Sequence, residues 1–380
     1  VEVRLWAPLP IRQALTQEHW RHLEWLGATV LETDPDPEDS ALWVEALFGL
    51  GQHRPLPEGL ALLLGERERV QPGRLISLDV PAGMHSNHGR MQAGGGAVAA
   101  DTLCVGLVKR GLVQDAALAN VGCLHRLDPG VPHQLIDSLA GPVVLRVMAK
   151  DLATLPVPQD PPTAMKYERG RVMLLAGSER YRGAALLTAQ GAMASGVGSL
   201  KAALPEPVAE RIWQWIPELV LSAGLPATAS GGLAWGPWLA QADLSRLDAL
   251  LLGPGIGGLS APWEAWAEPL LSFEGLLVLD ADGLNALAAS KQGWRWLCQR
   301  AFPTWITPHQ SEFARLFPDF RGREPLESAQ GAAAESGAVV LLKGAHSVIA
   351  DPNGVVHQLV DTSVQGARTG LGGLLAGFAL

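Results

Sequence analysis

The chain has 380 residues, of which 48% are apolar and 18% charged, and its formal net charge is −9. This length predicts two domains, each with enough apolar residues for a core. The acidic balance, without any run of lysine or arginine, excludes a basic surface for nucleic acids. No apolar run reaches the ~20 residues of a membrane span, so we expect a cytoplasmic protein without a membrane partner.

Both ends of the chain fall inside predicted elements. The start, VEVRLWAPLP, alternates like a strand, lacks an initiator Met and is not a signal peptide. The end, LLAGFAL, stops within a predicted helix, so we expect truncation at both ends.

Cys104, Cys123 and Cys298 show no metal-binding spacing, which predicts buried free thiols in a reducing cytosol.

The first third of the chain has the periodicity of alternating strands and helices. The predicted strands are residues 1–8, 28–33, 41–50, 75–80 and 100–108, with a helix over residues 17–26. Residues 111–131 show little regular pattern. Asp79 ends the strand LISLDV, and a carboxylate at that end of a parallel strand faces the ligand crevice of an open sheet. Turn formation or helix capping is the alternative role for Asp79.

A proline-rich tract, with Pro156, Pro158, Pro161 and Pro162, separates the two halves of the chain. Proline cannot donate to a β-ladder and favours an extended chain. We therefore expect domains at residues 1–145 and 166–380, joined by a linker at residues 146–165.

In the second half, the pattern of strand, polar strand end and helix recurs at least five times, which predicts a parallel sheet covered on both faces. The polar ends are GS, GPGIGG, DADGLN, TPH and KGAHS. We expect them to line one cleft. After TPH, a helix should begin with Ser311 or Thr307 as its cap.

The last glycine-rich stretch combines a strand-end lysine with a predicted loop and helix. LLKGAHSVIADPNG predicts a strand, a tight turn at Gly344 and a second strand at Val348 and Ile349, followed by a hairpin signal at Asp351-Pro352-Asn353-Gly354. VQGARTGLGGLLAG predicts a loop that opens a helix. Backbone N–H groups of such a loop, beside Lys343, can bind a phosphate. A strand, turn and helix without a ligand is the alternative.

Seven motifs in order resemble the dehydratase domain of the bifunctional NAD(P)H-hydrate repair enzymes: KYERG, LLAGSERYRGAA, LLLGPGIG, LDADGLN, ITPHQSE, LLKGAHSVIADPNG and GARTGLGGLLAG. In the first half, VEALFGLGQHRP, ISLDVPAG, AVAADTLCVGLVKRGL and NVGC resemble the epimerase domain of the same enzymes. The resemblance implies an α/β protein with an incomplete Rossmann-like domain followed by a ribokinase-like domain.

The activity implied by the resemblance is repair of hydrated NADH or NADPH. The second domain would use ADP or ATP, with Mg²⁺, to dehydrate the damaged cofactor, and the first would interconvert its two epimers. Assembly into a homo-oligomer is also implied. A ribokinase-like small-molecule kinase and a non-catalytic nucleotide-binding protein are the alternatives.

The resemblance also assigns the site residues. It places the nucleotide at Lys343, Gly344, Ala345, His346, Ser347 and Gly372. It places the hydrated dinucleotide at Ala184, Gly257 and His309 in the second domain, and at Gly49, Leu50, Gly51, Gln52, His53, Arg54 and Pro55 in the first. Asp79 would be the catalytic carboxylate of the first domain. Asp282, Asn285 and Glu312 would support the second site, with Asp282 and Asn285 also able to hold metal-bound water; for His309, a bond to the backbone is the alternative.

Several positions depart from the family pattern. Gly373 stands where the family has a catalytic Asp, whose loss typically costs ~10²–10⁴-fold in rate, and Leu371 replaces a small or hydroxyl residue. In the first domain, the expected K⁺ ligands map onto Glu45, in place of Asp, and Ala82, in place of Ser. A Gly- and Asn-rich loop that the family places before the first strand is not in the sequence. We expect weak dehydratase turnover, a doubtful K⁺ site and no epimerase activity.

Overall fold

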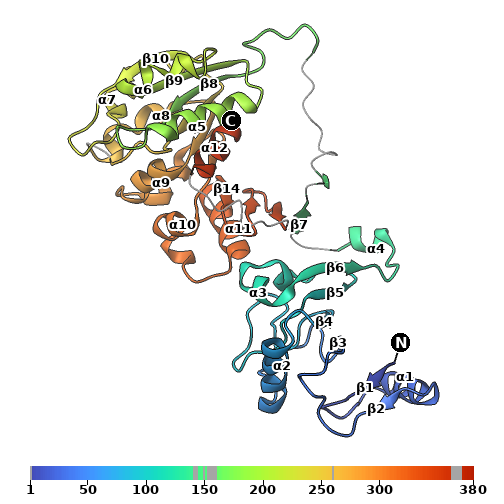
Figure 1. The fold of residues 1–380 in the computed structure, drawn as a ribbon. Helices are drawn as coiled ribbons and strands as arrows, with labels where there is room; N and C mark the ends of the chain where they lie inside the picture. Colours follow the sequence, from blue (N-terminus) through green and yellow to red (C-terminus); the bar gives the residue numbers. More distant parts are fainter. Residues whose placement is uncertain (1, 140–143, 149, 152–160, 259–260, 361–369) are drawn as a thin grey trace. The chain divides into compact units, whose positions relative to one another are not determined.

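The computed structural model describes residues 2–139, 144–148, 150–151, 161–258, 261–360 and 370–380 (Figure 1). Its contacts divide the chain into two compact units, Val1–Leu139 and Ala140–Leu380. Strand β7 (Val144–Val147) pairs with β16 (Val356–Leu359), so it belongs to the second unit. The second unit therefore takes in residues that we expected in the first domain and the linker, because β7 adds a strand to its sheet. Most of the proline-rich tract lies outside the described residues.

The first unit contains a parallel sheet in the order β3-β4-β5-β6. Its strands are β3 (Trp43–Glu45), β4 (Leu75–Leu78), β5 (Asp101–Val105) and β6 (Cys123–Leu127). A smaller parallel pair joins β1 (Arg4–Leu5) to β2 (Thr29–Val30). Strand β6 lies where the sequence showed no regular pattern, because an exposed edge strand needs no apolar alternation.

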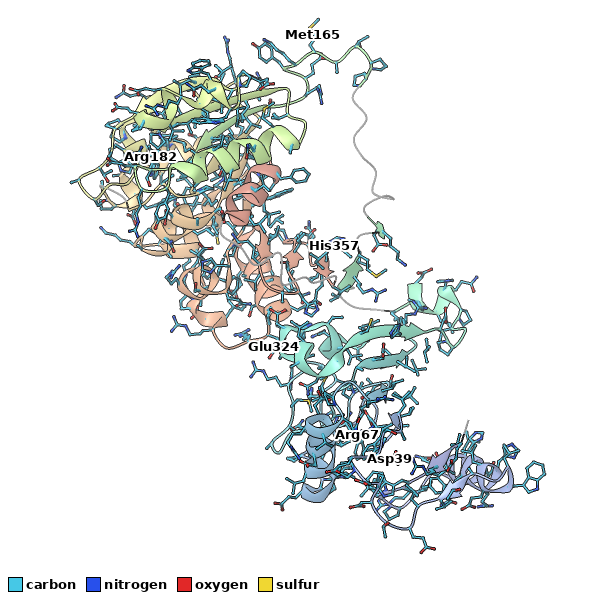
Figure 2. All side chains as sticks on the ribbon, in the orientation of Figure 1. Asp39, Arg67, Met165, Arg182, Glu324 and His357 are labelled. Carbon is cyan, nitrogen blue, oxygen red and sulfur yellow. The ribbon has the colours of Figure 1, made fainter. Side chains whose placement is uncertain are left out.

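The helices of the first unit are α1 (Ala14–Trp25), α2 (Glu58–Val70), α3 (Leu118–Val121) and α4 (His133–Asp137), with 3₁₀ turns η1 (Arg110–Val113) and η2 (Asp115–Ala117). Helix α2 buries Leu60, Leu64 and Arg67, which recur at helical spacing. The Arg67 guanidinium donates to the carbonyl oxygens of Pro37 and Asp39, and Figure 2 marks this region of the unit. This helix therefore fixes the chain that leads into β3.

The second unit is built on a sheet in the order β10-β9-β8-β11-β12-β13-β14-β15-β16-β7. Its further strands are β8 (Arg171–Leu175), β9 (Ser199–Pro205), β10 (Val220–Leu225), β11 (Ala249–Leu252), β12 (Leu276–Leu279), β13 (Thr304–Ile306), β14 (Val339–Leu342) and β15 (Val348–Ala350). The strands from β10 to β14 are parallel. Chain order reverses between β8 and β11, and ligands of such sheets bind at that point.

Helices cover both faces of this sheet (Figure 1). They are α5 (Arg182–Ala194), α6 (Glu206–Ala209), α7 (Trp235–Leu239), α8 (Glu268–Ser272), α9 (Ala281–Ala288), α10 (Gln310–Leu316), α11 (Pro325–Ser336) and α12 (Leu371–Phe378), with 3₁₀ turns η4 (Ile212–Gln214), η5 (Trp263–Ala265), η6 (Gly293–Gln299) and η7 (Pro318–Phe320). Leu250 and Leu252 join one apolar core, and Ala249 and Leu251 join the other. The predicted sheet with two covered faces is confirmed.

Two local features show how sequence sets this packing. The hairpin β15–β16 forms at the predicted turn, where Asp351 Oδ1 accepts 2.9 Å hydrogen bonds from the N–H groups of Asn353 and Val355. Helices α5 and α12 pack closely, and a Cβ at Gly191 or Gly377 would overlap backbone of the opposite helix.

Strands β9 and β10 were not predicted, because small residues and glycine weaken their β pattern. Within the described part of the chain, no helix is long and apolar enough to span a membrane.

Candidate active sites

The five polar strand ends of the second unit meet at one edge of its sheet. Strands β8, β11, β12, β13 and β14 are direct neighbours and parallel, so their carboxyl ends share that edge. Contacts link successive ends: Gly177 N donates to Pro254 O at 2.7 Å, and Lys343 N donates to Pro308 O at 2.8 Å. The cleft expected from the sequence therefore has its parts side by side.

Asp280 lies at the centre of this edge and is 1% exposed. Its Oδ1 accepts hydrogen bonds from Lys343 Nζ at 2.7 Å and from Thr307 Oγ1 at 2.9 Å. Three strand ends are thereby tied to one carboxylate. The family resemblance gives Asp280 no role of its own, although it belongs to the polar strand end DADGLN; its position directly after a buried strand is the signal that identifies it.

Lys343 also faces the start of α12. A Cβ added at Gly372 would lie 3.5 Å from Lys343 Nζ, so the ammonium group is close to the first turn of this helix. The N-terminus of a helix carries partial positive charge and unpaired N–H groups, which together favour an anion. The preceding loop residues, 361–369, lie outside the described residues. Lys343 and the first turn of α12, which are two parts of the predicted phosphate site, are therefore adjacent.

The Ser347 side chain closes the turn that follows Lys343. Ser347 Oγ accepts from Gly344 N at 3.3 Å and donates to Gly344 O at 3.1 Å. Gly344 and Ala345 are exposed at this turn and Ser347 is half-buried, whereas His346 is 6% exposed. The turn assigned to the nucleotide therefore combines two exposed residues with one buried imidazole.

A second group of residues surrounds the loop after β11. Gly257 N donates to Asp282 Oδ2 at 2.8 Å, and Asn285 Nδ2 donates to Asp282 Oδ1 at 3.4 Å. These bonds fix Gly257, whose φ of 74° suits glycine. The adjoining cavity, about 450 Å³, is lined by Gly257, Gly258, Ala261, Pro262, Trp263, Asp282, Asn285, Ala286 and Ala289. Asn285 Oδ1 is buried there without a hydrogen-bond partner among the described residues.

His309 begins helix α10 and caps it. Its Nδ1 accepts from the N–H groups of Ser311 at 3.1 Å and Glu312 at 3.4 Å, while Glu312 Oε2 accepts from His309 N at 2.9 Å. The expected cap at Ser311 or Thr307 is wrong, because the imidazole occupies the capping position itself. Its Nε2 lies 3.2 Å from Glu312 Oε1, and the side chain is 50% exposed. His309 therefore caps α10 through Nδ1 while half of its side chain remains exposed.

Gly373 sits against an unpaired hydroxyl group. A Cβ added there would lie 3.1 Å from Thr188 Oγ1, 3.7 Å from Pro254 Cβ and 4.0 Å from Ala184 O. Thr188 is fully buried, and its Oγ1 has no hydrogen-bond partner in the described part of the chain. Ala184, Gly373 and the loop after β11 thus lie close together.

In the first unit, Asp79 follows β4 with a φ of 71°, which is unusual for a residue other than glycine. Its Oδ1 accepts from Lys109 Nζ and, at 3.3 Å, from Val105 N. A Cβ at Gly49 would lie 3.0 Å from Asp79 Oδ2, so the loop after β3 approaches the carboxylate closely. Lys109 lies 30 residues from Asp79 in the chain, so the sequence order alone does not indicate this pair.

The expected substrate loop, residues 49–55, is held by its own side chains. Gln52 is 6% exposed; its Nε2 donates to Gly49 O, Val80 O and Pro81 O, and its Oε1 accepts from Gly83 N. Its amide therefore holds the backbone of the loop, and a ligand-binding role for Gln52 stays a prediction. His53 lies beside His85, with ring centroids 5.4 Å apart.

His85 also stacks on His88, with ring centroids 3.8 Å apart. Burial, followed by the charges of His88 and His53, lowers the pKa of His85. His85 therefore favours its neutral form beside the loop.

The residues at the expected K⁺ position do not fit the ion. Glu45 is 6% exposed, and its two carboxylate oxygens accept from Ala82 N at 3.0 Å and Leu47 N at 3.3 Å. Burial raises the pKa of Glu45, although these backbone hydrogen bonds oppose the increase. The Ala82 methyl group offers no oxygen ligand. The assignment of Glu45 as a K⁺ ligand is therefore not supported by its geometry.

The cysteines are free, as expected, but only Cys104 is buried. Cys123 and Cys298 are exposed. The expectation that all three thiols would be buried is therefore wrong.

The strand order, its reversal point and the polar strand ends define a ribokinase-like α/β unit preceded by a smaller α/β unit. Residues 172–380 match the family model described as NAD(P)H-hydrate dehydratase, and residues 1–111 match the model of the YjeF-related protein N-terminus. The chain belongs to the family of bifunctional NAD(P)H-hydrate repair enzymes.

Relatives with that printed name include one from Synechocystis sp., 39% identical, with 99% of this chain and 70% of the relative covered. Another, from Gloeobacter violaceus, is 38% identical, with 99% and 73% covered. A solved ribokinase-like superfamily protein from Enterococcus faecalis is 22% identical, with a TM-score of 0.52 over 63% of this chain and 80% of that chain. The last likeness concerns the fold alone.

Proposed function

We propose that residues 166–380 act on hydrated NADH or NADPH with ADP or ATP as the phosphoryl donor. The observation that carries this proposal is the convergence of Lys343, Asp280 and the start of α12 beside the loop that carries Gly257. A nucleotide phosphate beside Lys343 would lie next to the loop assigned to the damaged dinucleotide. Membership in the repair-enzyme family supports the same substrate pair.

The nucleotide would bind along the turn after β14 and the first turn of α12. Lys343 supplies a fixed positive charge, and Gly372 lets the phosphate approach the helix N-terminus. Exposed Gly344 and Ala345 and half-buried Ser347 would contact the nucleotide, while buried His346 would hold the turn.

The hydrated dinucleotide would bind against the loop after β11. Ala184, Gly257 and His309 remain its proposed contacts, with His309 presenting Nε2 while Nδ1 caps α10. Asp282 would hold Gly257 in place and Glu312 would orient the imidazole. Asn285 Oδ1 would be available to the substrate, since it has no hydrogen-bond partner among the described residues.

Mg²⁺ would enter with the nucleotide phosphates and reduce their charge. Asp280 and Asp282 are the carboxylates at this strand end, and both already accept hydrogen bonds from the protein. We assign no residue of the chain as a direct ligand of the ion.

Turnover should be slow, because Gly373 offers no base to the substrate hydroxyl. Restoring a carboxylate by Gly373→Asp should raise dehydration of hydrated NADH by ~10²–10⁴-fold, and Gly373→Ala is the matched control. Nucleotide affinity should change little in either variant. Normal repair by the unmodified chain, without a gain in Gly373→Asp, would contradict the proposal.

A non-catalytic nucleotide-binding protein is the second candidate, and Gly373 is the observation that favours it. Calorimetry with ADP or ATP, combined with an assay of hydrate repair, separates the two functions. Nucleotide binding with slow repair supports the dehydratase function. Nucleotide binding without repair, in both the unmodified chain and the Gly373→Asp variant, supports the non-catalytic function. Phosphorylation of an unrelated alcohol would instead indicate a small-molecule kinase.

For residues 1–145 we propose an epimerase-like fold without epimerase turnover and without a bound K⁺. Glu45 fills the expected ion position with a carboxylate that already has backbone partners. Equal concentrations of KCl and NaCl should give the same melting temperature, and chromatography should show no accelerated interconversion of the hydrate epimers. A K⁺-specific stabilisation or rapid epimerisation would overturn this assignment.

A further inference from the structure

Three side chains with metal-binding atoms lie together on the sheet of the first unit. Cys123 and His125 are two residues apart on β6, so both side chains extend to the same face of the strand. Asp101 opens β5 and pairs directly with Cys123 in the register of the two strands. The thiol sulfur, a carboxylate oxygen and an imidazole nitrogen all lie within 4.8 Å of one another.

The backbone holds these three groups in position and leaves them accessible. Cys123 N donates to Ala100 O at 2.8 Å, which fixes the start of β6 against β5. His125 Nε2 lies 2.8 Å from Asp101 Oδ1, and these side chains are 49% and 41% exposed. Cys123 is also exposed. An ion could therefore reach all three groups from solvent without opening the fold.

The donor atoms select the class of ion. A thiolate and an imidazole prefer zinc and similar borderline metals over Ca²⁺ or Mg²⁺, which prefer oxygen ligands. Zn²⁺ binds sulfur, nitrogen and oxygen at about 2.0–2.3 Å in tetrahedral geometry. Ligand atoms that already lie within 4.8 Å need only a small contraction to reach that arrangement. Three protein ligands would leave the fourth position to water.

This cluster lies away from the dinucleotide-binding edge proposed for the first unit. Asp101 and Cys123 are the first residues of parallel strands β5 and β6. Asp79 and Lys109 follow the opposite, carboxyl ends of strands β4 and β5. Because the strands are parallel, the two groups occupy opposite ends of the sheet. A ligand at the cluster is therefore independent of the site around Asp79.

We propose that Asp101, Cys123 and His125 bind one Zn²⁺ ion per chain, with Co²⁺ as a spectroscopic substitute. The Cys123 thiol forms the sulfur–metal bond and releases its proton to solvent, so no electron is transferred. The ion would replace the direct contact between His125 and Asp101 and cross-link the edge strand β6 to β5. A surface His–Asp ion pair beside an unrelated free thiol is the competing explanation.

Titration of the purified full chain with Co²⁺ tests the proposal. One equivalent should produce a thiolate-to-metal charge-transfer band and the visible bands of tetrahedral Co²⁺, and Zn²⁺ should displace both. Cys123→Ser and His125→Ala should abolish the charge-transfer band, whereas Cys298→Ser should keep it. Asp101→Asn should weaken binding by about 10–100-fold, the usual cost of losing a carboxylate that ligates the metal or orients its imidazole. Absence of the band in the unmodified chain, or its persistence in Cys123→Ser, would overturn the proposal.

Alkylation provides a second readout that does not depend on any variant. Cys123 and Cys298 are both exposed, so Cys298 serves as an internal control. Zn²⁺ should slow alkylation of Cys123 by at least tenfold in mass spectrometry of the peptides, a protection comparable to ligand occupancy above 90%, while Cys298 reacts at an unchanged rate. Equal protection of both thiols would indicate nonspecific binding, and protection of neither would exclude the site.

Discussion

Lys343 Nζ lies 2.7 Å from Asp280 Oδ1, although 63 residues separate the two in the chain. The lysine follows β14 and the aspartate follows β12, and Thr307, which follows β13 between them, donates to the same oxygen. Asp280 is almost fully buried, whereas the lysine side chain is 19% exposed. The pair therefore holds a cation at the open side of the sheet edge, where a phosphate can approach it.

Removing Lys343 should cost both stability and nucleotide binding. Lys343→Met leaves Asp280 buried without its counter-ion, and breaking a buried pair in this way typically costs about 3–5 kcal/mol of unfolding free energy. Urea denaturation should show this loss, and calorimetry should show weaker binding of ADP. The double variant Asp280→Asn with Lys343→Met should recover part of the stability but none of the affinity. Unchanged unfolding of Lys343→Met would show that Asp280 does not depend on the pair.

Thr188 should be a source of instability that a carboxylate at position 373 relieves. A buried hydroxyl without a partner costs about 1–3 kcal/mol, so Thr188→Val should stabilise the chain by roughly 1 kcal/mol. In a Gly373→Asp background the same change should instead remove a hydrogen-bond donor and reduce the gain in dehydration. Additive effects of the two substitutions on unfolding and turnover would argue against contact between these positions.

His309 should show separable structural and binding roles. His309→Ala removes the cap of α10 and should lower the unfolding free energy by about 1 kcal/mol. His309→Asn can still accept from the helix N–H groups and should retain most of that stability. Both variants lose Nε2, so both should bind the hydrated dinucleotide weakly in calorimetry. Full binding by His309→Asn would restrict His309 to the capping role.

Glu45 should make the first unit less stable as pH rises. Its folded-state pKa is raised by burial, so the folded unit favours the protonated form more than the unfolded chain does. The stabilising contribution is complete below the ordinary pKa of Glu, about 4.3, and is lost as pH rises through the raised value. Hydrogen exchange of the β3 and β4 amides should accelerate over this range beyond the intrinsic effect of pH. Glu45→Gln should flatten the dependence, and an unchanged profile would contradict it.

Sequence patterns predicted much of the second unit because its determinants are local. Continuous apolar runs such as ALLL in β11 predict strands covered on both faces, and a polar residue after each run predicts a shared edge. The turn at Asp351 was predicted for the same reason. Strands β6, β9 and β10 were not predicted, because they are exposed or rich in small residues and take their structure from neighbouring strands.

The sequence alone determined the alternation of strands and helices, the order of the polar strand ends and the residue types available for chemistry. Tertiary structure decided which of these groups are free to act. Lys343 meets Asp280, and Cys123 meets Asp101 and His125, only because sheet order and register bring distant segments together. Glu45 and Gln52 have polar atoms suited to ligands, yet these atoms form hydrogen bonds with backbone N–H and C=O groups. A buried polar atom must find a partner, and which partner it finds depends on the packing of the whole unit.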